Sequence, residues 1–313
     1  MALRTCLEKA GLARADRWGD LTWAGPRGVA VVFTGDTVDR WRPGLSKQDP
    51  RYSDRTASLG EEPNEELRIE NEINSLATAA SKNGSTVVRL VGNHEFSGRF
   101  GHGCHNVSEL TLGITSRASE NRREQACALR HDRFRLNRDL GDALSRVGGL
   151  RCIVAVDGAL ACHGGVRPEL AVELHAAGLH LSYANELLTK AWAGAQLTDG
   201  EHEWYEKLLD SDTGILWDRS LSETRPSDEY VGEVMRAVQL HYPDVHTLVV
   251  GHSIQSHGVD VVETPHGRVV RVDVGMSRSF AGDDEPGDGT GYVRRHAQVA
   301  RYTVKTNNVT RIA

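Results

Sequence analysis

The sequence of 313 residues predicts an α/β domain with mixed β-sheets. In the first half of the chain, short runs of β-branched and apolar residues alternate with segments of helical periodicity, which is typical of strands joined by helices. In the second half, apolar runs come in pairs around two-residue turn signals, which is typical of antiparallel hairpins. We expect one domain over residues 1–313, because a chain of this length can bury one large core.

The first half contains two predicted strands and two predicted helical regions. Residues 29–33 and 86–91 are short apolar runs, and each indicates a buried strand. Between them, residues 41–63 are polar and rich in turn residues, which indicates an exposed loop. An amphipathic helix follows the loop, because apolar side chains recur there at helical spacing. These side chains are Ile69, Ile73, Leu76, Ala77 and Ala80, and a charged helical region covers residues 120–143.

The second half contains three predicted hairpins and a long helical segment. A strand is expected at residues 247–250, and the mostly helical residues 183–242 precede it. We expect this helical segment to form an accessory cap near the functional site. The first hairpin joins residues 151–156 and 159–162 through Asp157-Gly158. The second joins residues 259–263 and 268–274 through His266-Gly267, and the third joins residues 298–304 and 309–312 around Asn307-Asn308.

The composition excludes some classes of function. The chain has 37 basic and 43 acidic residues, a formal charge of −6 and no basic run, which argues against nucleic-acid and anionic-membrane partners. No apolar run is long enough to span a bilayer, and the first residues lack the apolar region of a signal peptide. Of the five cysteines, Cys152 and Cys162 lie in apolar runs and are expected to be core thiols. We therefore expect a cytoplasmic location.

Four predicted strands end in glycine and polar residues. Residues 31–40, VVFTGDTVDR, place two aspartates and an arginine after an apolar run, although a buried carboxylate is costly unless a cation or hydrogen bonds compensate it. The other three strands end in Gly-Asn-His-Glu at 92–95, His-Gly-Gly at 163–165 and Gly-His-Ser at 251–253. Sites in open α/β sheets gather at the carboxyl ends of strands, so we expect these side chains to converge.

The converging side chains predict a metal site. Asp36, Asn93, His163 and His252 offer carboxylate, amide and imidazole donors, and this mixture favours Mn, Fe or Zn over Mg. Each motif alone also has a structural interpretation, since Gly-Asp and Gly-Asn are turn dipeptides and a histidine after a strand is often only hydrogen-bonded. The occurrence of four such tips in one chain favours the metal interpretation.

The four motifs, in the order GDTVDR, GNHE, HGG and GHS, resemble the phosphoprotein phosphatase (PPP) branch of the calcineurin-like metallophosphoesterases. LEKAGL at 7–12, LWDR at 216–219 and VDVGMS at 272–277 are similar to the bacterial Shewanella-like protein phosphatases. The resemblance covers about residues 7–277 and implies two mixed β-sheets packed as a central sandwich flanked by helices. It also implies hydrolysis of phosphomonoesters, with phosphoproteins as substrates, by in-line attack of a metal-bound hydroxide.

The resemblance implies a ligand set. Asp36 would bridge two divalent metals, and Asn93, His163 and His252 would complete the protein ligands of the second metal.

The resemblance also implies catalytic roles for residues beside the metals. His94 would protonate the leaving oxygen as a general acid, and Asp39 would orient its imidazole. Arg40 would bind phosphate oxygens with its planar guanidinium group. Arg219 in LWDR is a candidate for a second phosphate contact, with a surface turn as the alternative.

The sequence departs from the PPP pattern before Asp36. The family carries an Asp-x-His motif there that supplies the first metal's own ligands, but neither Asp16 nor Asp20 is followed two residues later by histidine. A preceding segment or a true loss of the first metal site would each explain the difference. His102 and His105 are candidate substitutes, with plain surface histidines as the alternative. We expect two metals in a complete site, one fully liganded metal here, and a chain that binds phosphate or vanadate but hydrolyses esters poorly.

The sequence is compatible with three alternative functions. A pseudophosphatase would bind phosphoproteins without turnover, and a dinucleoside polyphosphate hydrolase would share the same site motifs. A serine hydrolase would use Ser253, because Gly251-His252-Ser253 follows a strand as a nucleophile turn does. That third interpretation leaves GDTVDR and GNHE unexplained, and Gln255 stands where such a turn needs glycine.

Overall fold

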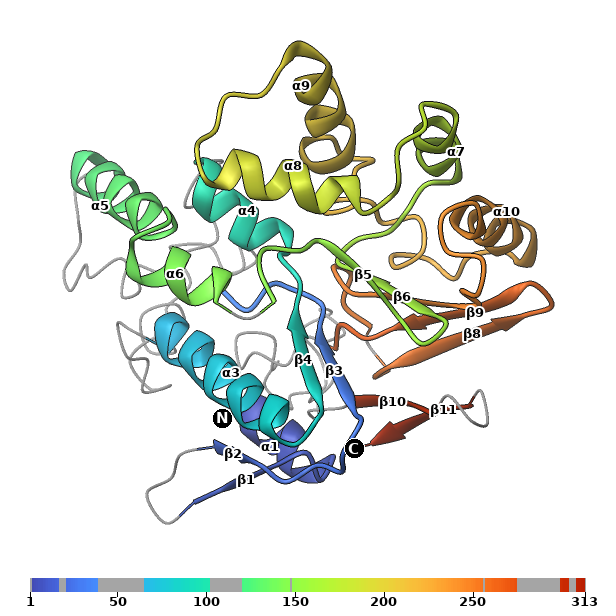
Figure 1. Cartoon of the computed structure of the whole chain (residues 1–313), viewed down its shortest axis with the longest axis horizontal. Coiled ribbons are helices and arrows are strands. Elements are labelled where there is room, and N and C mark those ends of the chain that lie inside the picture. Colours follow the sequence, from blue (N-terminus) through green and yellow to red (C-terminus); the bar gives the residue numbers. More distant parts are fainter. Residues whose placement is uncertain are drawn as a thin grey trace, which may run out of the picture.

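A computed structural model describes residues 2–16, 21–38, 65–101, 120–146, 148–255, 257–274, 299–303 and 308–312. These residues form two layers of β-structure with helices on the outer faces, which confirms the predicted α/β class with mixed sheets (Figure 1). Within the described ranges, no helix combines the length and the apolar character that a membrane crossing requires.

The larger sheet has five strands in the order β5-β6-β7-β9-β8. Strands β6, β7 and β9 run parallel to one another, while the edge strands β5 and β8 are antiparallel to their hairpin partners. The carboxyl ends of β6 and β7 therefore lie at the same edge of the sheet. The five strands are β5 (Ile153–Val156), β6 (Ala159–Cys162), β7 (Thr247–Val250), β8 (Asp260–Thr264) and β9 (Gly267–Arg271).

The second layer consists of two strand pairs. Strands β3 (Ala30–Phe33) and β4 (Thr86–Arg89) pair in parallel, so their carboxyl ends also meet at one edge. Strands β10 (Val299–Thr303) and β11 (Asn308–Ile312) form an antiparallel pair. Apolar side chains join the layers into a sandwich, because branched side chains on the two inner faces exclude water from each other. They are Val32, Val88 and Leu90 against Val154, Ala161 and Val249, and Ala300 and Val309 against Val261 and Val270.

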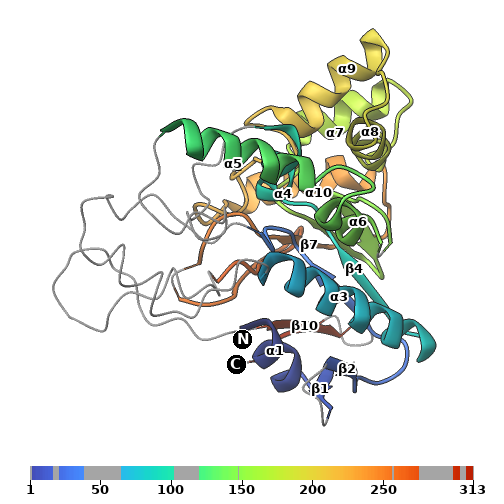
Figure 2. The same cartoon turned by 90° about the vertical axis from the view of Figure 1, so that its left-hand side faces the viewer.

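Helix α3 (Glu65–Lys82) covers the outer face of the β3-β4 pair (Figure 2). Its apolar stripe matches the predicted helical spacing, and it packs together with α1 (Ala2–Lys9) and the small hairpin β1 (Ala13–Ala15) and β2 (Leu21–Trp23). The shared core contains Leu7, Ala13, Leu21, Ile73, Leu76, Ala80 and Val87. This small hairpin was not predicted from the sequence.

Of the remaining helices, α7 (Pro168–Ala176) and α10 (Asp228–Gln239) cover the outer face of the five-stranded sheet, whereas α6 (Asp139–Ser145) lies beside α3 (Figure 1). Leu160, Leu248 and Val269 from the sheet share one core with Leu174 and Val238 from two of these helices. The helices are α4 (Asn93–Phe100), α5 (Glu120–Arg133), α6 (Asp139–Ser145), α7 (Pro168–Ala176), α8 (Tyr183–Trp192), α9 (Asp199–Tyr205), the π-helix η1 (Glu206–Asp210) and α10 (Asp228–Gln239).

The predicted hairpins are present. Asp157 and Gly158 have φ of 46° and 79°, and positive φ at both central positions is the mark of the tight turn that fits twisted strands. The next hairpin also forms, but Gly267 is already the first residue of β9 and the turn itself contains His266. Strands β10 and β11 pair as expected, with Thr303 opposite Asn308.

The helical predictions hold in outline and differ in detail. Residues 120–143 contain two helices rather than one, because residues 134–138 form a turn in which Asn137 has φ of 67°. Residues 183–242 are mostly helical, as expected. Helix α7 was not predicted, although Pro168 at its first turn is a recognised start signal.

The described cysteines bear on the compartment prediction. Cys152 and Cys162 are buried free thiols, as expected, and burial raises the pKa of Cys152 to about 12. Cys127 is disulfide-bonded, which the scattered cysteine spacing did not predict. Since disulfides are more typical of oxidising compartments, the cytoplasmic location stays a prediction.

Candidate metal centre and active site

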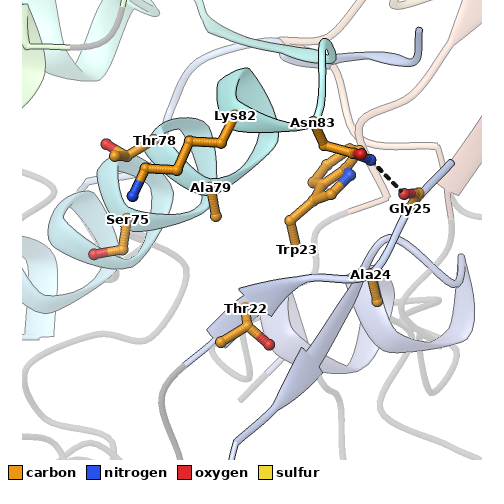
Figure 3. A pocket seen from close by; sticks show the side chains of 9 residues that line it. All are labelled: Thr22, Trp23, Ala24, Gly25, Ser75, Thr78, Ala79, Lys82 and Asn83. Carbon is orange, nitrogen blue, oxygen red and sulfur yellow. Dashed lines mark hydrogen bonds between the residues drawn. The ribbon is translucent and has the colours of Figure 1, made fainter. Parts of the chain in front are cut away.

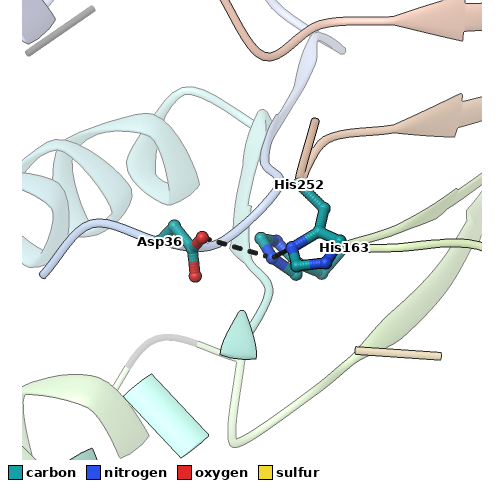
Figure 4. A group of neighbouring side chains, drawn as sticks. All are labelled: Asp36, His163 and His252. Atoms are coloured by element: carbon teal, nitrogen blue, oxygen red, sulfur yellow. Dashed lines mark hydrogen bonds and ion pairs between the residues drawn. The ribbon is translucent and has the colours of Figure 1, made fainter. Parts of the chain in front are cut away.

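Four predicted ligands lie together where the two sheet layers end. Asp36 follows β3, Asn93 begins α4 just after β4, His163 directly follows β6 and His252 follows β7. One ligand atom each of Asp36, His163 and His252 lies within 4.8 Å of the other two. Figure 4 shows the Asp36 carboxylate facing the two imidazole rings. The Asn93 amide oxygen lies 2.9 Å from His163 Nε2. The parallel strand pairs of both layers therefore bring donors from four distant segments to one point.

His163 occupies the centre of this group. Its Nδ1 donates to the backbone oxygen of Thr34 at 2.6 Å, which fixes the ring and directs Nε2 inward. The inward Nε2 lies 3.3 Å from Asp36 Oδ2 and 3.2 Å from His252 Nδ1. A carboxylate oxygen, an amide oxygen and a second imidazole nitrogen thus surround one nitrogen. This arrangement is stabilised by a positive species, either a proton or a metal ion.

The electrostatics of the group fit a cation site. Burial alone would raise the pKa of Asp36, but His163 and His94 hold that pKa well below its usual range, so Asp36 is ionised. Burial would lower the pKa of His163, yet Asp36 beside it raises that pKa overall. Burial, together with the nearby His163 and Arg219, lowers the pKa of His252 to about 3. His252 is therefore neutral near pH 7, which is the form that binds metals.

Two of these residues have strained backbone conformations, which are common at functional sites. The backbone φ angles of Asp36 and His252 are 54° and 63°, and residues other than glycine rarely adopt such positive values. His252 is 8% exposed, and its Nε2 has no hydrogen-bond partner among the described residues. An unpaired buried nitrogen costs free energy, which a metal ligand bond or a ligand contact would recover.

Glycines let the strand ends approach one another. A Cβ atom on Gly92 would lie 2.3 Å from Asp36 Oδ1, and one on Gly35 would lie 2.6 Å from the backbone nitrogen of Gly92. Real Cβ atoms essentially never come this close to another atom, so only glycine fits at these two positions. The glycines of GDTVDR and GNHE therefore have a packing role at the site.

His94 and Arg219 lie beside the predicted ligands. The His94 backbone N–H donates to Asp36 Oδ1 at 3.0 Å, and its Nε2 lies 3.7 Å from Asp36 Oδ2. Arg219 donates to the backbone oxygen of His252 at 3.3 Å and to Ser253 Oγ at 3.1 Å. A hollow of about 510 Å³ opens beside His252, and Arg219 and Trp217 line it together with Arg167. The guanidinium group of Arg219 is thus placed to reach a ligand in this hollow.

The rest of the LWDR motif supports the His163 loop. Asp218 is fully buried and forms an ion pair with Arg167 at 2.9 Å. Its carboxylate lies so close to Gly165 that a Cβ there would be 2.4 Å from Asp218 Oδ2. The prediction for this motif concerned a phosphate contact by Arg219, with a surface turn as the alternative, so the role of Asp218 was missed.

Ser253 does not have the geometry of a nucleophile. Its Oγ accepts hydrogen bonds from Ser222 at 2.8 Å and from Arg219 at 3.1 Å, and the residue is 6% exposed. These contacts explain Ser253 as a structural link between the His252 turn and the LWDR segment. They argue against the serine hydrolase alternative.

Glu95, the last residue of GNHE, was not predicted to have a role at the site. Its carboxylate accepts hydrogen bonds from the backbone N–H groups of Gly92 and Asp36 at 2.7 and 2.9 Å. The available signal was the spacing of a helix capping box, in which a glutamate at the third helical position bonds back to the residue before the helix. Gly92 has no side chain, so the usual Ser or Thr marker was missing.

Several predicted residues lie outside the described ranges. Asp39 and Arg40 follow Val38, the last described residue of GDTVDR, and His102 and His105 come just after Gly101. The roles of Asp39 and Arg40 therefore stay implied by the resemblance alone.

A second hollow, of about 660 Å³, lies between β2 and the end of α3 (Figure 3). Among the described residues, its lining contains the indole of Trp23, the ammonium group of Lys82 and several hydroxyl and amide groups, and neither a carboxylate nor an imidazole. Asn83 spans one side of it by donating to the backbone oxygen of Gly25 at 3.1 Å. The described lining of this hollow therefore does not offer the donors that the group around His163 offers.

Comparisons with known proteins test the fold. Neither protein-family models nor curated proteins gave a match. Among solved structures, a cold-active protein tyrosine phosphatase from a psychrophilic Shewanella species matches with a TM-score of 0.60 at 18% sequence identity. The match covers 100% of this chain and 76% of that chain. A point mutant of the cold-active protein tyrosine phosphatase matches with a TM-score of 0.61, the same identity and the same coverage.

A further structure of a cold-active protein tyrosine phosphatase has a TM-score of 0.58 at 20% identity, covering 89% of this chain and 67% of that chain. The Shewanella protein is a structural neighbour of the kind that the sequence resemblance implied. This chain has the fold of the cold-active protein tyrosine phosphatases.

Proposed function

We propose that this protein is a metal-dependent phosphatase that hydrolyses phosphomonoesters on phosphoproteins. The observation that carries the proposal is the convergence of Asp36, Asn93, His163 and His252, from four separate strand ends, on one buried point. The fold of known phosphatases and the placement of His94 and Arg219 beside this point support it.

The donor set fits a divalent transition metal. Two imidazoles, one carboxylate and one amide oxygen are borderline ligands, which favours Mn, Fe or Zn over Mg. When bound, such a metal supplies an acidic water and neutralises charge on the phosphoryl oxygens. In the arrangement that the resemblance implies, Asp36 would be shared by two metals, and Asn93, His163 and His252 would complete the protein ligands of one of them.

The chain's own residues perform the other tasks. His94 gives its proton to the leaving oxygen, because an alkoxide is a poor leaving group without protonation. Arg219 binds phosphate oxygens from the hollow beside His252. Asp39 orients His94 and Arg40 binds phosphate, as the resemblance implies.

The substrate is a phosphorylated side chain of a protein or peptide. The neighbouring structures are described as protein tyrosine phosphatases, which favours phosphotyrosine over phosphoserine and phosphothreonine. The acidic net charge of −6 gives no general attraction for nucleic acid or other polyanions.

A substrate panel tests the proposal. The protein is loaded with Mn²⁺ and assayed for phosphate release from matched peptides carrying phosphotyrosine, phosphoserine or phosphothreonine, and from a dinucleoside tetraphosphate. Release from the peptides that disappears in Asp36→Asn supports the phosphatase. Activity on the dinucleotide alone would replace it with a polyphosphate hydrolase, and tight phosphopeptide binding without release would replace it with a pseudophosphatase.

A further inference from the structure

Glu95 connects the two strand ends that carry Asp36 and Asn93. It is fully buried, and its Oε2 accepts from Gly92 N at 2.7 Å and from Asp36 N at 2.9 Å. Its Oε1 accepts from Thr37 N at 2.6 Å and from Val38 N at 3.2 Å, and it lies 2.9 Å from Thr37 Oγ1. One carboxylate therefore holds the turn after β3 against the start of α4.

The three successive N–H groups of Asp36, Thr37 and Val38 point at the same carboxylate. Successive backbone N–H groups that converge in this way form a concave anion site. The convergence requires the backbone of Asp36 to adopt its unusual φ of 54°. Glu95 thus compensates the strain of the conformation that turns the Asp36 carboxylate toward His163.

A second buried contact fixes the other side of the turn. Thr37 Oγ1 lies 2.5 Å from Glu70 Oε1, and Glu70 forms an ion pair with Arg89. Glu70 and Arg89 are 0% and 2% exposed, and Arg89 also donates to the backbone oxygens of residues 143 and 144 in α6. The turn is therefore attached through Thr37 to α3, β4 and α6, all of which belong to the core.

From these contacts we infer that Glu95 is a positioning residue for the metal centre and that Thr37, held by Glu70, assists it. The inference rests on the proposed function, because it concerns the same metal ligands. Glu95 sets the Asp36 carboxylate and the Asn93 amide at the spacing in which both bind one ion. Loss of a residue that orients ligands in this way typically weakens metal affinity by about 10- to 100-fold.

A different result is expected if Glu95 is only a helix cap. Glu201 also closes a capping box, since its carboxylate accepts from Thr198 N at 2.9 Å at the start of α9, and its contacts there are to Thr198 and Lys190. If Glu95 only caps α4, then neutralising either glutamate should affect stability alone. If Glu95 positions the ligands, then only its own neutralisation should change metal binding.

The experiment compares Glu95→Gln with Glu201→Gln in the full chain. Glutamine keeps the shape of glutamate, but its NH₂ group faces at least two of the backbone N–H donors whichever way it is oriented. Mn²⁺ affinity is measured by calorimetric titration, and the ligand geometry by the visible absorption of bound Co²⁺. We expect Glu95→Gln to weaken Mn²⁺ binding by about 10- to 100-fold and to alter the Co²⁺ spectrum. Glu201→Gln should leave both unchanged.

A second pair of variants decides the matter if Glu95→Gln does not fold. Thr37→Val removes the hydroxyl group with little change in volume and should weaken Mn²⁺ binding by about fivefold. Thr37→Ser keeps the hydroxyl group and should recover that loss.

The outcomes separate this inference from the proposed function. Wild-type affinity and spectrum in a folded Glu95→Gln, or equal affinities for Thr37→Val and Thr37→Ser, would overturn the inference alone. Failure of the wild-type chain to take up Mn²⁺ or Co²⁺ would overturn both.

Discussion

The Nε2 atom of His163 lies 2.9 Å from the amide oxygen of Asn93, although the two residues are 70 positions apart in the chain. An oxygen acceptor faces a ring nitrogen whose opposite side already donates to the backbone of Thr34. Only a proton or a metal ion between or beside the two atoms makes this contact favourable. Several expected outcomes depend on which of these species the site binds.

Removal of a ligand should abolish tight metal binding. We expect Asp36→Ala and His252→Ala each to weaken Mn²⁺ binding by more than about 100-fold, since loss of a direct ligand exceeds the effect of its supporting contacts. Elemental analysis of the purified proteins and titration with Mn²⁺ measure the change. His202→Ala, which removes an exposed histidine on α9, serves as the control. Unchanged affinity in both ligand variants would refute the site.

Substitution of His94 should separate proton donation from metal binding. His94→Asn should lower kcat by about 10²- to 10⁴-fold on a phosphopeptide while Mn²⁺ affinity stays near the wild-type value. The loss should be much smaller on p-nitrophenyl phosphate, because a nitrophenolate leaves without a proton. Steady-state rates on the two substrates provide the measurement. Equal losses on both substrates would contradict a general-acid role.

Substitution of Arg219 should weaken the binding of phosphate analogues. Loss of a charge-assisted hydrogen bond costs about 1.5–3 kcal/mol, so Arg219→Ala should raise the Kd for vanadate by about 10- to 100-fold. Metal affinity should not change. Arg225→Ala, which removes a nearby exposed arginine, is the matched control. Vanadate binding that is equal in both variants would show that Arg219 belongs to a surface turn.

Acid should destabilise the fold through His241. Burial, with smaller effects from His180 and His175, lowers the pKa of His241 below its usual 6.5. Above pH 6.5 the imidazole is neutral in both the folded and the unfolded chain, so it has no effect. As the pH falls below 6.5, the unfolded chain binds the proton first, and the free energy of unfolding decreases.

Urea unfolding at pH 7.5 and pH 5.5 tests this effect. His241→Gln keeps a donor for the backbone oxygen of Ala171, which His241 Nε2 contacts at 2.8 Å, but it cannot titrate. The variant should therefore lose less stability than the wild-type chain between the two pH values. A larger loss in the variant would show that the sign is wrong.

Close packing at Gly92 should make it intolerant of any side chain. Gly92→Ala places a Cβ 2.3 Å from Asp36 Oδ1 and 2.6 Å from Asp36 N, so the turn must move and metal affinity should fall by at least about tenfold. Gly200→Ala in α9 meets no atom within 4 Å and should raise stability by up to about 1 kcal/mol. Thermal unfolding and Mn²⁺ titration of both variants measure these effects. Retention of full metal affinity in Gly92→Ala would contradict the described geometry.

The elements that hold the predicted ligands could be read from the sequence because their signals are local. The run at residues 247–250 matches β7 residue for residue, and Asp157-Gly158 forms the expected turn. Parallel pairing then brings the strand ends together by general rules of sheet structure. The position of the candidate metal centre follows from these few facts.

The supporting residues could not be read in the same way, because their partners are distant in sequence. Glu95 bonds to N–H groups that lie 57 to 59 positions earlier, and Asp218 supports a loop that lies some 50 positions earlier. Their carboxylates look like ordinary surface acids until the packing shows that they are buried. Burial of a charge is decided by tertiary structure, and no local pattern reports it.

The site's dependence on both sheet layers has a consequence for how the protein folds. Asp36 and Asn93 come from the β3-β4 pair, whereas His163 and His252 come from the five-stranded sheet. No fragment limited to one layer has the whole ligand set, so a metal ion bound through these four residues binds only a chain whose sandwich is already closed. Such an ion stabilises the native state by mass action and slows unfolding, while the long-range pairing that must come first keeps folding slow. Resistance to protease in the presence and absence of Mn²⁺ would therefore report closure of the sandwich.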